Sequence, residues 1–457
     1  MPFLSFNDKI RTGIIEGVDS MDFLAGHEML VSGLILIIAY IFIATEKIQK
    51  SVVALFGASL TLLLGFVPQY KTEDMANIKT VFDYIQFDVV FLLVGMMIIV
   101  QIASKSGMFD WMAINLLRLT KGHPKKVLFA LAAFTAIASA FLDNVTTVVL
   151  IMPVTFAIAK KLEINPVPFL ITEIIASNIG GTATLIGDPP NIIIGMKAGI
   201  SFMQFVNELT GIIALIFLVC IPLLIYMFRK QLNTTKEKMA HISNLDNSKT
   251  ITDKKLMIRS SIVLLAVIAG FASHDITHIA AYVFAITGAS ILLMFEKPKE
   301  IYEDVEWLTI FFFIGLFIII GGFEASGGIS FLAQKLIEFT NGSLNLACLF
   351  VLWGSGIMSG IVDNIPYTAT MAPLISQIQH TMPHPNDVNP LWWALSLGAC
   401  LGGNLTIIGA AANVIVCEMA EAKGYKIGFV EFFKYGSLIT LISLLMSTAY
   451  LYARFLI

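Results

Sequence analysis

Charged residues are scarce in this sequence. Asp, Glu, Lys and Arg make up 13% of its 457 residues, against about 25% in a typical soluble domain. Hydrophobic residues make up 57%, and the formal net charge is −3. This composition excludes a string of soluble domains and predicts one polytopic membrane protein. The small net charge gives no reason to expect nucleic acid as a partner.

Cysteines are few and scattered. The four cysteines, at positions 220, 348, 400 and 417, lie in apolar surroundings and form no CxxC pair. The seven histidines show no ligand spacing. These patterns exclude a disulfide framework and a zinc site, so we expect no cofactor apart from a coupling ion.

The N-terminus lacks the pattern of a cleavable signal. Residues 1–26 carry charges of both signs, and no basic stretch there is followed by an apolar core. We expect an N-terminal extramembrane segment at 1–26.

Apolar runs are the dominant feature of the rest of the chain. A bilayer core of about 30 Å needs about 20 apolar residues per helix. Eight runs are predicted to span the membrane, at about 28–45, 51–68, 87–104, 208–228, 257–273, 279–295, 306–323 and 432–455. Lys and Arg gather in the regions between some of them, including 105–126 and 229–255, which we place in the cytoplasm as loops.

Two further apolar regions, 127–200 and 344–420, are interrupted by Asp-Asn, Gly-Gly, Pro and Asn. Glycine and proline end helices, which leaves backbone groups unpaired. Irregular backbone at membrane depth is tolerated only inside protein or beside a water-filled cavity. The sequence therefore predicts that both regions are interior and that they form the binding site.

Two motifs occur twice in the same order. An Asp-Asn pair at 143–144 recurs 220 residues later at 363–364. A segment with Gly-Gly, Thr, Gly and Asn at 179–195 recurs 222 residues later at 401–417. Two separate motifs at nearly the same offset indicate an internal repeat.

Each half is expected to cross the membrane five times, and an odd number of crossings inverts the second copy. The predicted fold is an all-α polytopic membrane protein with about 10 transmembrane helices and an inverted-topology repeat, an architecture common in secondary transporters. The predicted parts are a first repeat at 27–228 with a re-entrant hairpin at 125–160 and a broken helix at 165–200, a cytoplasmic linker at 229–256, and a second repeat at 257–457 with a hairpin at 344–380 and a broken helix at 390–420.

Three carboxylates, Asp143, Asp188 and Asp363, lie at membrane depth on this reading. A charge there costs about 2.5–3.5 kcal/mol or more, so each carboxylate needs a partner, a cation or a proton. Each also has a structural reading as a helix N-cap. The second repeat has Ala410 where the first has Asp188, so this carboxylate breaks the symmetry.

Oxygen atoms dominate the interrupted motifs, and hard cations prefer oxygen ligands. We expect Na⁺ at Asp143, Asn144, Asp188, Asp363 and Asn364. The predicted substrate- and ion-binding residues are Asp143, Asn144, Thr146, Thr147, Gly180, Gly181, Thr184, Asp188, Asn191, Asp363, Asn364, Thr368, Gly402, Gly403, Asn404, Thr406 and Asn413.

The stretches 140–154 and 177–195 resemble the ArsB/NhaD permease family of the ion transporter superfamily, in its P protein-like branch, which is related to divalent-anion/sodium symporters. The resemblance covers about 28–455. It implies a scaffold domain and a transport domain, a homodimer, an elevator-like movement and a place in the inner (plasma) membrane.

The predicted function is secondary active transport of a small inorganic ion, coupled to Na⁺ or H⁺, and no enzymatic activity is expected. Arsenite or oxyanion efflux and Na⁺/H⁺ antiport both stay open. The alternatives are a passive ion channel and a dicarboxylate/sodium symporter. An intramembrane aspartyl protease is remote, because residue 186 is Ile where a GxGD motif has Gly, and because a protease leaves the repeat unexplained.

Overall fold

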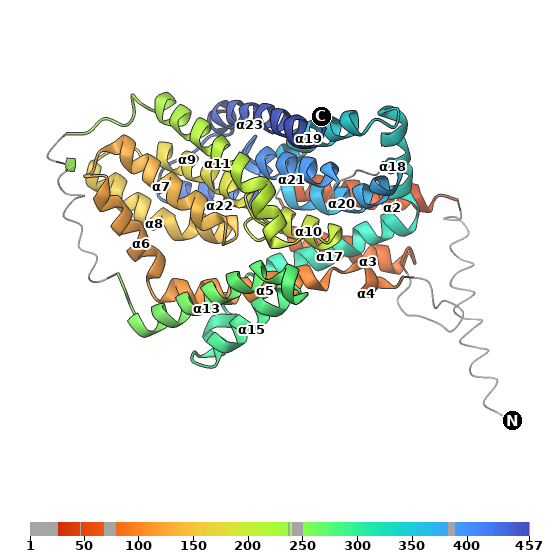
Figure 1. The fold of residues 1–457 in the computed structure, drawn as a ribbon, viewed down its shortest axis with the longest axis horizontal. Coiled ribbons are helices and arrows are strands. Elements are labelled where there is room, and N and C mark those ends of the chain that lie inside the picture. The colour runs from red at the N-terminus through yellow and green to blue at the C-terminus, as the bar shows by residue number, and fades with distance from the viewer. Residues whose placement is uncertain are drawn as a thin grey trace. The chain divides into compact units, whose positions relative to one another are not determined.

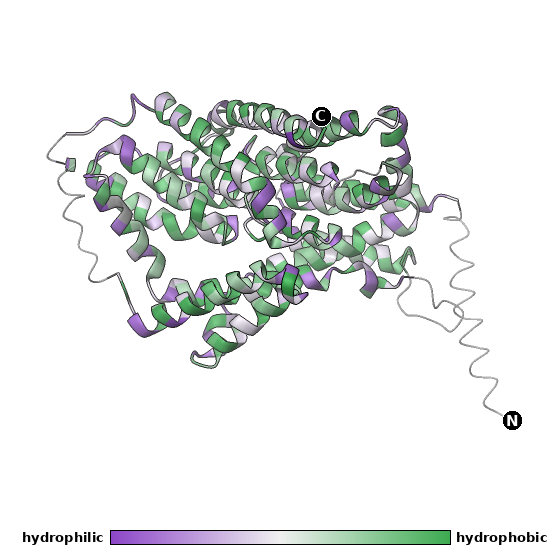
Figure 2. Ribbon diagram, in the orientation of Figure 1, coloured by the Kyte–Doolittle hydropathy of each residue, from purple (hydrophilic) through white to green (hydrophobic). Residues whose placement is uncertain are grey.

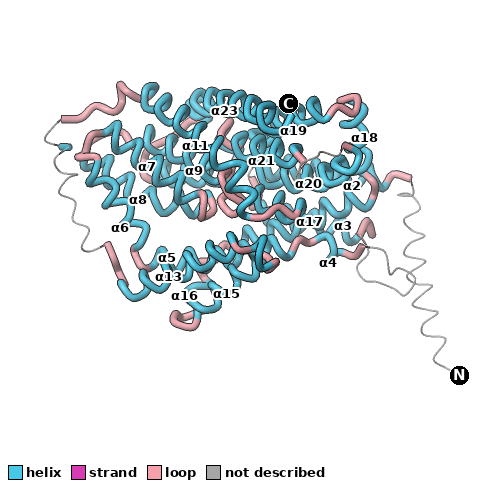
Figure 3. Tube along the Cα trace, viewed as in Figure 1, coloured by secondary structure: helices cyan, strands magenta, loops and turns pink. Residues whose placement is uncertain are grey.

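The computed structural model describes residues 26–45, 47–67, 79–235, 238–239, 250–382 and 389–456. Most of the predicted N-terminal segment and parts of the predicted linker lie outside these residues. The described residues form helices joined by loops and contain no strand (Figure 3). The all-α prediction is confirmed.

Eight helices in the described residues are long and apolar enough to cross a membrane. Most of their length is hydrophobic, and polar residues gather toward helix ends and turns (Figure 2). These eight helices are α2 (Glu28–Thr45), α5 (Phe87–Lys105), α8 (Asn144–Leu162), α11 (Phe202–Met227), α13 (Lys254–Ala272), α17 (Trp307–Ala325), α19 (Leu344–Val362) and α23 (Phe429–Leu451), the last continued by η4 (Tyr452–Leu456).

Two of the predicted spans are shorter than expected. The run at 51–68 forms α3 (Lys50–Leu63), and the run at 279–295 forms α15 (Ala281–Leu293). Helix α3 is followed by Gly65 with φ +72°, a left-handed conformation that favours glycine and turns the chain. Short one-turn helices occupy connections, namely α4 (Val81–Tyr84), α14 (His274–Thr277) and α16 (Pro298–Tyr302).

One compact unit comprises Met1–Gln86 and Leu308–Gln334, and it contains α2, α3, α4 and most of α17. Helices α3 and α17 meet at small residues. A Cβ atom on Gly315 would lie 2.6 Å from the carbonyl carbon of Ala54, and one on Gly57 would lie 2.6 Å from Cδ1 of Ile319. The absence of side chains at these glycines allows the two helices to pack closely.

The second compact unit comprises Phe87–Trp307 and Lys335–Ile457. Within it, α5 packs on α15 through the same kind of contact, because a Cβ atom on Gly95 would lie 2.7 Å from the carbonyl carbon of Ala285. Gly95 and Gly315 are 220 residues apart, which is the offset of the two Asp-Asn pairs. The repeat therefore extends beyond the motifs to helix packing inside each unit.

Two amphipathic helices lie outside the predicted spans. They are α6 (Met108–Leu119), within the basic region expected as a loop, and α18 (Gly328–Phe339). In α18 the apolar residues Ile329, Ala333 and Leu336 recur at helical spacing, and all three are buried. Their mixed composition hides them from a search for long apolar runs.

The interrupted regions form four pairs of helices in the second unit (Figure 1). Helix α7 packs on α9 and α19 packs on α21, whereas α10 packs on α20 and α22 packs on α8. Each half-helix that follows a break thus packs on the hairpin of the other half. The bounds not yet given are α7 (Pro124–Ser139), α9 (Val167–Gly181), α10 (Pro189–Ala198), α20 (Asn364–Thr381), α21 (Pro390–Gly402), η3 (Ile407–Gly409) and α22 (Ala411–Ala422).

Candidate functional site

An asparagine closes each helix break. In the first break, Nδ2 of Asn191 donates to the carbonyl oxygens of Thr182 at 3.2 Å and Thr184 at 2.9 Å, with Gly181 at 3.4 Å. In the second, Nδ2 of Asn413 donates to backbone carbonyls at 2.7 Å and 2.9 Å. These amides satisfy carbonyl groups that the interrupted helices leave without partners.

Hydroxyl groups hold each hairpin tip against the broken helix of its own half. Thr184 donates to the carbonyl oxygen of Ala140, and Thr406 donates to that of Gly360 at 2.6 Å. At the preceding residue of each hairpin, Ser139 donates to a carbonyl of α9 at 2.9 Å, and the serine 220 residues later donates to a carbonyl of α21 at 2.5 Å. The repeated motifs therefore build the same contacts twice. The opposite orientation of the two halves in the bilayer stays a prediction.

A chain of buried amides joins the two halves. Asn144 donates to Oδ1 of Asn178 at 3.3 Å, and Nδ2 of Asn178 lies 3.0 Å from Oδ1 of both Asn404 and Asn413. All four side chains are buried. The sequence prediction included three of them and missed Asn178, although its place two residues before the Gly-Gly pair was a signal for it.

Asp188 lies where the first break faces the second hairpin, and it is 1% exposed. Nδ2 of Asn364 lies 3.2 Å from each oxygen of this carboxylate. Asn144 and Cys400 also interact with the carboxylate, and it forms no ion pair with a described Lys, Arg or His. Neutral donors stabilise a buried negative charge only in part, so the arrangement suits a bound cation or proton.

The other two predicted carboxylates cap helices. Asp143 is half-buried and accepts a hydrogen bond from the backbone N–H of Thr146 at 2.9 Å. Asp363 is 1% exposed and accepts from the N–H of Ile365 at 3.1 Å. Asp188 makes no such cap hydrogen bond. The structure thus separates Asp188 from the two capping residues, in line with its place outside the symmetry of the repeat.

The four predicted glycines allow close approach of backbone segments. A Cβ atom on Gly180 would overlap the backbone of α7, and one on Gly402 would lie 2.5 Å from the carbonyl oxygen of Gly356 in α19. A Cβ atom on Gly181 would lie 2.5 Å from Oδ1 of Asn144, whereas one on Gly403 would meet no atom closer than 3.2 Å. The first break is therefore more tightly packed than the second.

Three of the predicted site residues carry a buried polar atom without a hydrogen-bond partner. In the described part of the chain these atoms are Oγ1 of Thr147, Oγ1 of Thr368 and Nδ2 of Asn404. Buried polar groups are nearly always paired, so such atoms are expected to bind water, an ion or a substrate.

The helix N-termini differ in what they offer to an anion. Asp143 caps the N-terminus of α8, and Asp363 caps that of α20. Helix α10 begins with two prolines, which carry no N–H. Helix α22 begins after Ala410 and has no side-chain cap. An anion would therefore meet a free helix N-terminus at α22, and carboxylates or prolines at the other three.

The described residues contain no group of three or more His, Cys, Asp or Glu that could hold a metal ion together. The polar atoms around Asp188 are amide and carboxylate groups, with one thiol. The amide of Asn364 faces Asp188 through its nitrogen, so the carboxylate supplies the oxygen atoms, which suit Na⁺ better than a transition metal.

Glu173 is a further buried carboxyl group, 2% exposed. The hydroxyl of Thr155 donates to it at 2.6 Å. This contact joins α8 to α9 and explains the residue as part of the packing between them.

Buried amides, two broken helices and two hairpins in an apolar helical chain define an integral membrane transporter. The chain belongs to the citrate transporter family, CitMHS, whose sequence model matches residues 40–398. It is 39% identical to a 46 kDa membrane protein of Mycobacterium leprae over 93% of this chain and 98% of the relative. It is 38% identical to an uncharacterised transporter of Mycobacterium tuberculosis over the same shares.

The predicted resemblance to the P protein branch is confirmed. The chain is 32% identical to the human P protein over 90% of this chain and 58% of that protein. Two solved structures share the fold. The YdaH transporter of Alcanivorax borkumensis has a TM-score of 0.56 at 14% identity, over 93% of this chain and 98% of its own. MtrF of Neisseria gonorrhoeae has a TM-score of 0.51 at 12% identity, over 91% and 95%.

Proposed function

We propose that this protein is a secondary active transporter in which Asp188 binds the coupling ion, Na⁺ or H⁺. One observation carries the proposal: a buried carboxylate lies between the two halves and has amide donors, but no basic partner, among the described residues. Uncompensated burial of a charge at membrane depth is costly, and a bound cation or proton removes that cost.

The transported species is proposed to be a small inorganic ion. Na⁺/H⁺ antiport requires that the two cations compete for Asp188. Efflux of neutral arsenite would use the unpartnered donors of Thr147, Thr368 and Asn404, which suit a polar, uncharged molecule. Both readings place the coupling ion at the same carboxylate.

Citrate is a second candidate, because the family description names it. Three carboxylates, Asp143, Asp188 and Asp363, disfavour a bare polyanion at the breaks. Citrate would therefore need cations beside it, and the uncapped N-terminus of α22 would be its most favourable contact. This candidate and the inorganic ion differ in substrate but share the cation site.

Alternating access is proposed to follow the elevator-like movement that the resemblance implies, with the protein as a homodimer in the plasma membrane. The contacts that hold each hairpin on its own broken helix support movement of these elements together. A passive channel built on the same fold would carry an ion without coupling it to a second one.

The test uses the full chain reconstituted into proteoliposomes with a pH-sensitive dye inside. A pH gradient is imposed, and Na⁺, Li⁺, K⁺, arsenite and citrate are added in turn to wild type and to Asp188→Asn. We expect one of these solutes to dissipate the gradient in wild type, and we expect the effect to disappear in the variant. Asp143→Asn is the matched control, because asparagine also caps helices well.

Dissipation by Na⁺ or Li⁺ identifies an antiporter, and dissipation only by arsenite or citrate identifies a permease that couples the solute to protons. Equal coupled transport by wild type and Asp188→Asn would overturn the role of Asp188. A passive channel would instead show a flux proportional to the gradient, without saturation and without coupling to a second ion.

A further inference from the structure

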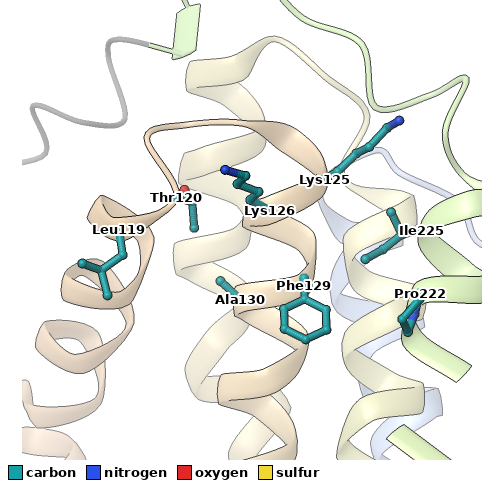
Figure 4. Close-up of a pocket in the computed structure, with 8 residues that line it drawn as sticks. All are labelled: Leu119, Thr120, Lys125, Lys126, Phe129, Ala130, Pro222 and Ile225. Carbon is teal, nitrogen blue, oxygen red and sulfur yellow. The ribbon is translucent and has the colours of Figure 1, made fainter. Parts of the chain in front are cut away.

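A basic pocket lies at the start of the first hairpin, between α7 and α11. It has a volume of about 500 Å³ and is lined by residues that include Lys125, Lys126 and Phe129 of α7 and Pro222 and Ile225 of α11. Figure 4 shows Lys125 and Lys126 on the first turns of α7 with their ammonium groups pointing to opposite sides, and the apolar side chains of Phe129, Ala130 and Pro222 below them. Neither lysine forms an ion pair with a described residue.

A second, almost wholly apolar pocket continues along the same two helices. It has a volume of about 430 Å³ and is lined by residues of α7, α9 and α11, among them Ala136, Ile137 and Ala214. The rings of Phe129, in the basic pocket, and Phe217, in the apolar one, meet edge to face with centroids 5.9 Å apart. The two pockets therefore form one seam with a charged end and an apolar end.

The length of the seam matches one leaflet of a bilayer. Lys126 and Ile137 are separated by eleven residues of α7, or about 16 Å at the helical rise of 1.5 Å per residue. Half of a hydrocarbon core of about 30 Å is about 15 Å. A molecule with its charged group at the lysines would reach the hairpin tip with one acyl chain.

We propose that an anionic phospholipid binds along this seam, with its phosphate at the end that Lys125 and Lys126 flank and one acyl chain in the apolar groove. Two lysines that form no ion pair with a described residue, beside an apolar groove, complement a negative headgroup and a hydrocarbon tail. Basic pockets between transmembrane helices on the cytoplasmic side bind anionic headgroups in this way. The positive-inside rule places these lysines on that side.

The bound chain contacts the part of the site that holds the hairpin in place. Thr184 and Ala140 line the apolar groove, and their hydrogen bond joins the tip of the first hairpin to the first break. Gly180, which also lines the groove, is packed against the backbone of α7. The acyl chain fills the space beside these contacts, so the lipid raises the transport rate by supporting the hairpin.

Binding is tested on the purified full chain by native mass spectrometry and by titration with fluorescent lipid. Phosphatidylglycerol is the anionic probe and phosphatidylcholine the neutral one. Lys125→Ala with Lys126→Ala is expected to weaken phosphatidylglycerol binding about tenfold or more. Lys160→Ala with Lys161→Ala is the matched control, because that pair lies at the other end of the same hairpin and outside the seam.

The apolar end is tested by Ala214→Phe, which fills the groove from its exposed wall. Leu215→Phe is the matched control, since Leu215 is exposed on the same helix and does not line the groove. We expect Ala214→Phe to release lipid and Leu215→Phe to retain it. Inorganic phosphate is expected not to displace the lipid, because it cannot occupy the groove.

Equal binding of the two lipids, or unchanged phosphatidylglycerol binding in both the lysine and the Ala214 variants, would overturn the proposal. Binding is measured without transport, so this result is independent of the role of Asp188. Proteoliposomes then connect the lipid to function: phosphatidylglycerol is expected to raise the initial rate of wild type and not that of the lysine variant. An equal rise in both proteins contradicts the functional part of the proposal.

Discussion

The two broken helices share their framework and differ in their charge. Each break is closed by an asparagine at the same place in the repeat, and each is held to its hairpin by a threonine hydroxyl. The first break carries Asp188 followed by two prolines, whereas the second carries three alanines at 410–412. The repeat thus preserves the contacts that build the breaks, and it differs at the residue that carries a charge.

The difference extends to the amides and to packing. Asn178 of the first half corresponds to Cys400 of the second. The amide that joins the two halves, by donating to Asn404 and Asn413, is therefore present in the first half and has no counterpart in the second. Backbone and side-chain atoms crowd Gly181 more closely than Gly403. One half therefore provides a compact, charged site and the other provides neutral partners to it. We infer that a transporter with symmetric halves can hold its coupling ion on one of them.

Replacing Asp188 by Ala, as in the second half, is expected to have the largest effect. The change removes the charged ligand and leaves the amide of Asn364 without its acceptor. We expect coupled transport to fall about 100-fold or more, which corresponds to ~2.7 kcal/mol of lost interaction. Initial rates in proteoliposomes measure it, and a rate within threefold of wild type would show that the asymmetry has no role in coupling.

Adding a methyl group to the two matching glycines is expected to have an intermediate and unequal effect. Gly181→Ala places Cβ against Asn144 and the carbonyl of Gly187, so we expect a destabilisation of about 1–3 kcal/mol. In Gly403→Ala the added Cβ would lie 3.2 Å or more from its neighbours, so we expect the free energy of unfolding to fall by less than about 1 kcal/mol. Thermal unfolding in detergent compares the variants. A larger loss in Gly403→Ala would contradict the unequal packing.

Cys400→Ser is expected to have the smallest effect. The thiol lies 3.4 Å from Oδ1 of Asn191, and this oxygen already accepts a hydrogen bond from Ser396 at 2.6 Å. A hydroxyl group replaces the thiol as donor to Asn191 and to the carboxylate of Asp188, so transport should stay within about threefold of wild type. Cys400→Ala is the comparison, because it removes the donor without adding volume at this buried position. Loss of transport in both variants would show that the thiol itself is required.

Local patterns in the sequence predicted most of the helices. The apolar runs placed α2, α5 and α17 within a few residues, because a helix in lipid satisfies its own backbone and needs only length and apolar side chains. The amphipathic helices α6 and α18 were missed, since their charged residues interrupt the apolar run. The breaks at Gly181 and Pro189 were found because glycine and proline act on their own backbone.

The sequence by itself determined that this is a helical membrane protein with repeated helix breaks, because apolar length and backbone chemistry are local properties. Only the tertiary structure decided which polar groups meet. Asp188 and Asn364 are 176 residues apart, and Asn178 reaches two asparagines of the other half. Such pairs form because α10 packs on α20 and α21 approaches α9, and no pattern within either segment specifies that packing. The packing between these segments also decides that Asp188 meets the amide of Asn364 and makes no cap hydrogen bond, whereas Asp143 and Asp363 cap the helices of the two hairpins.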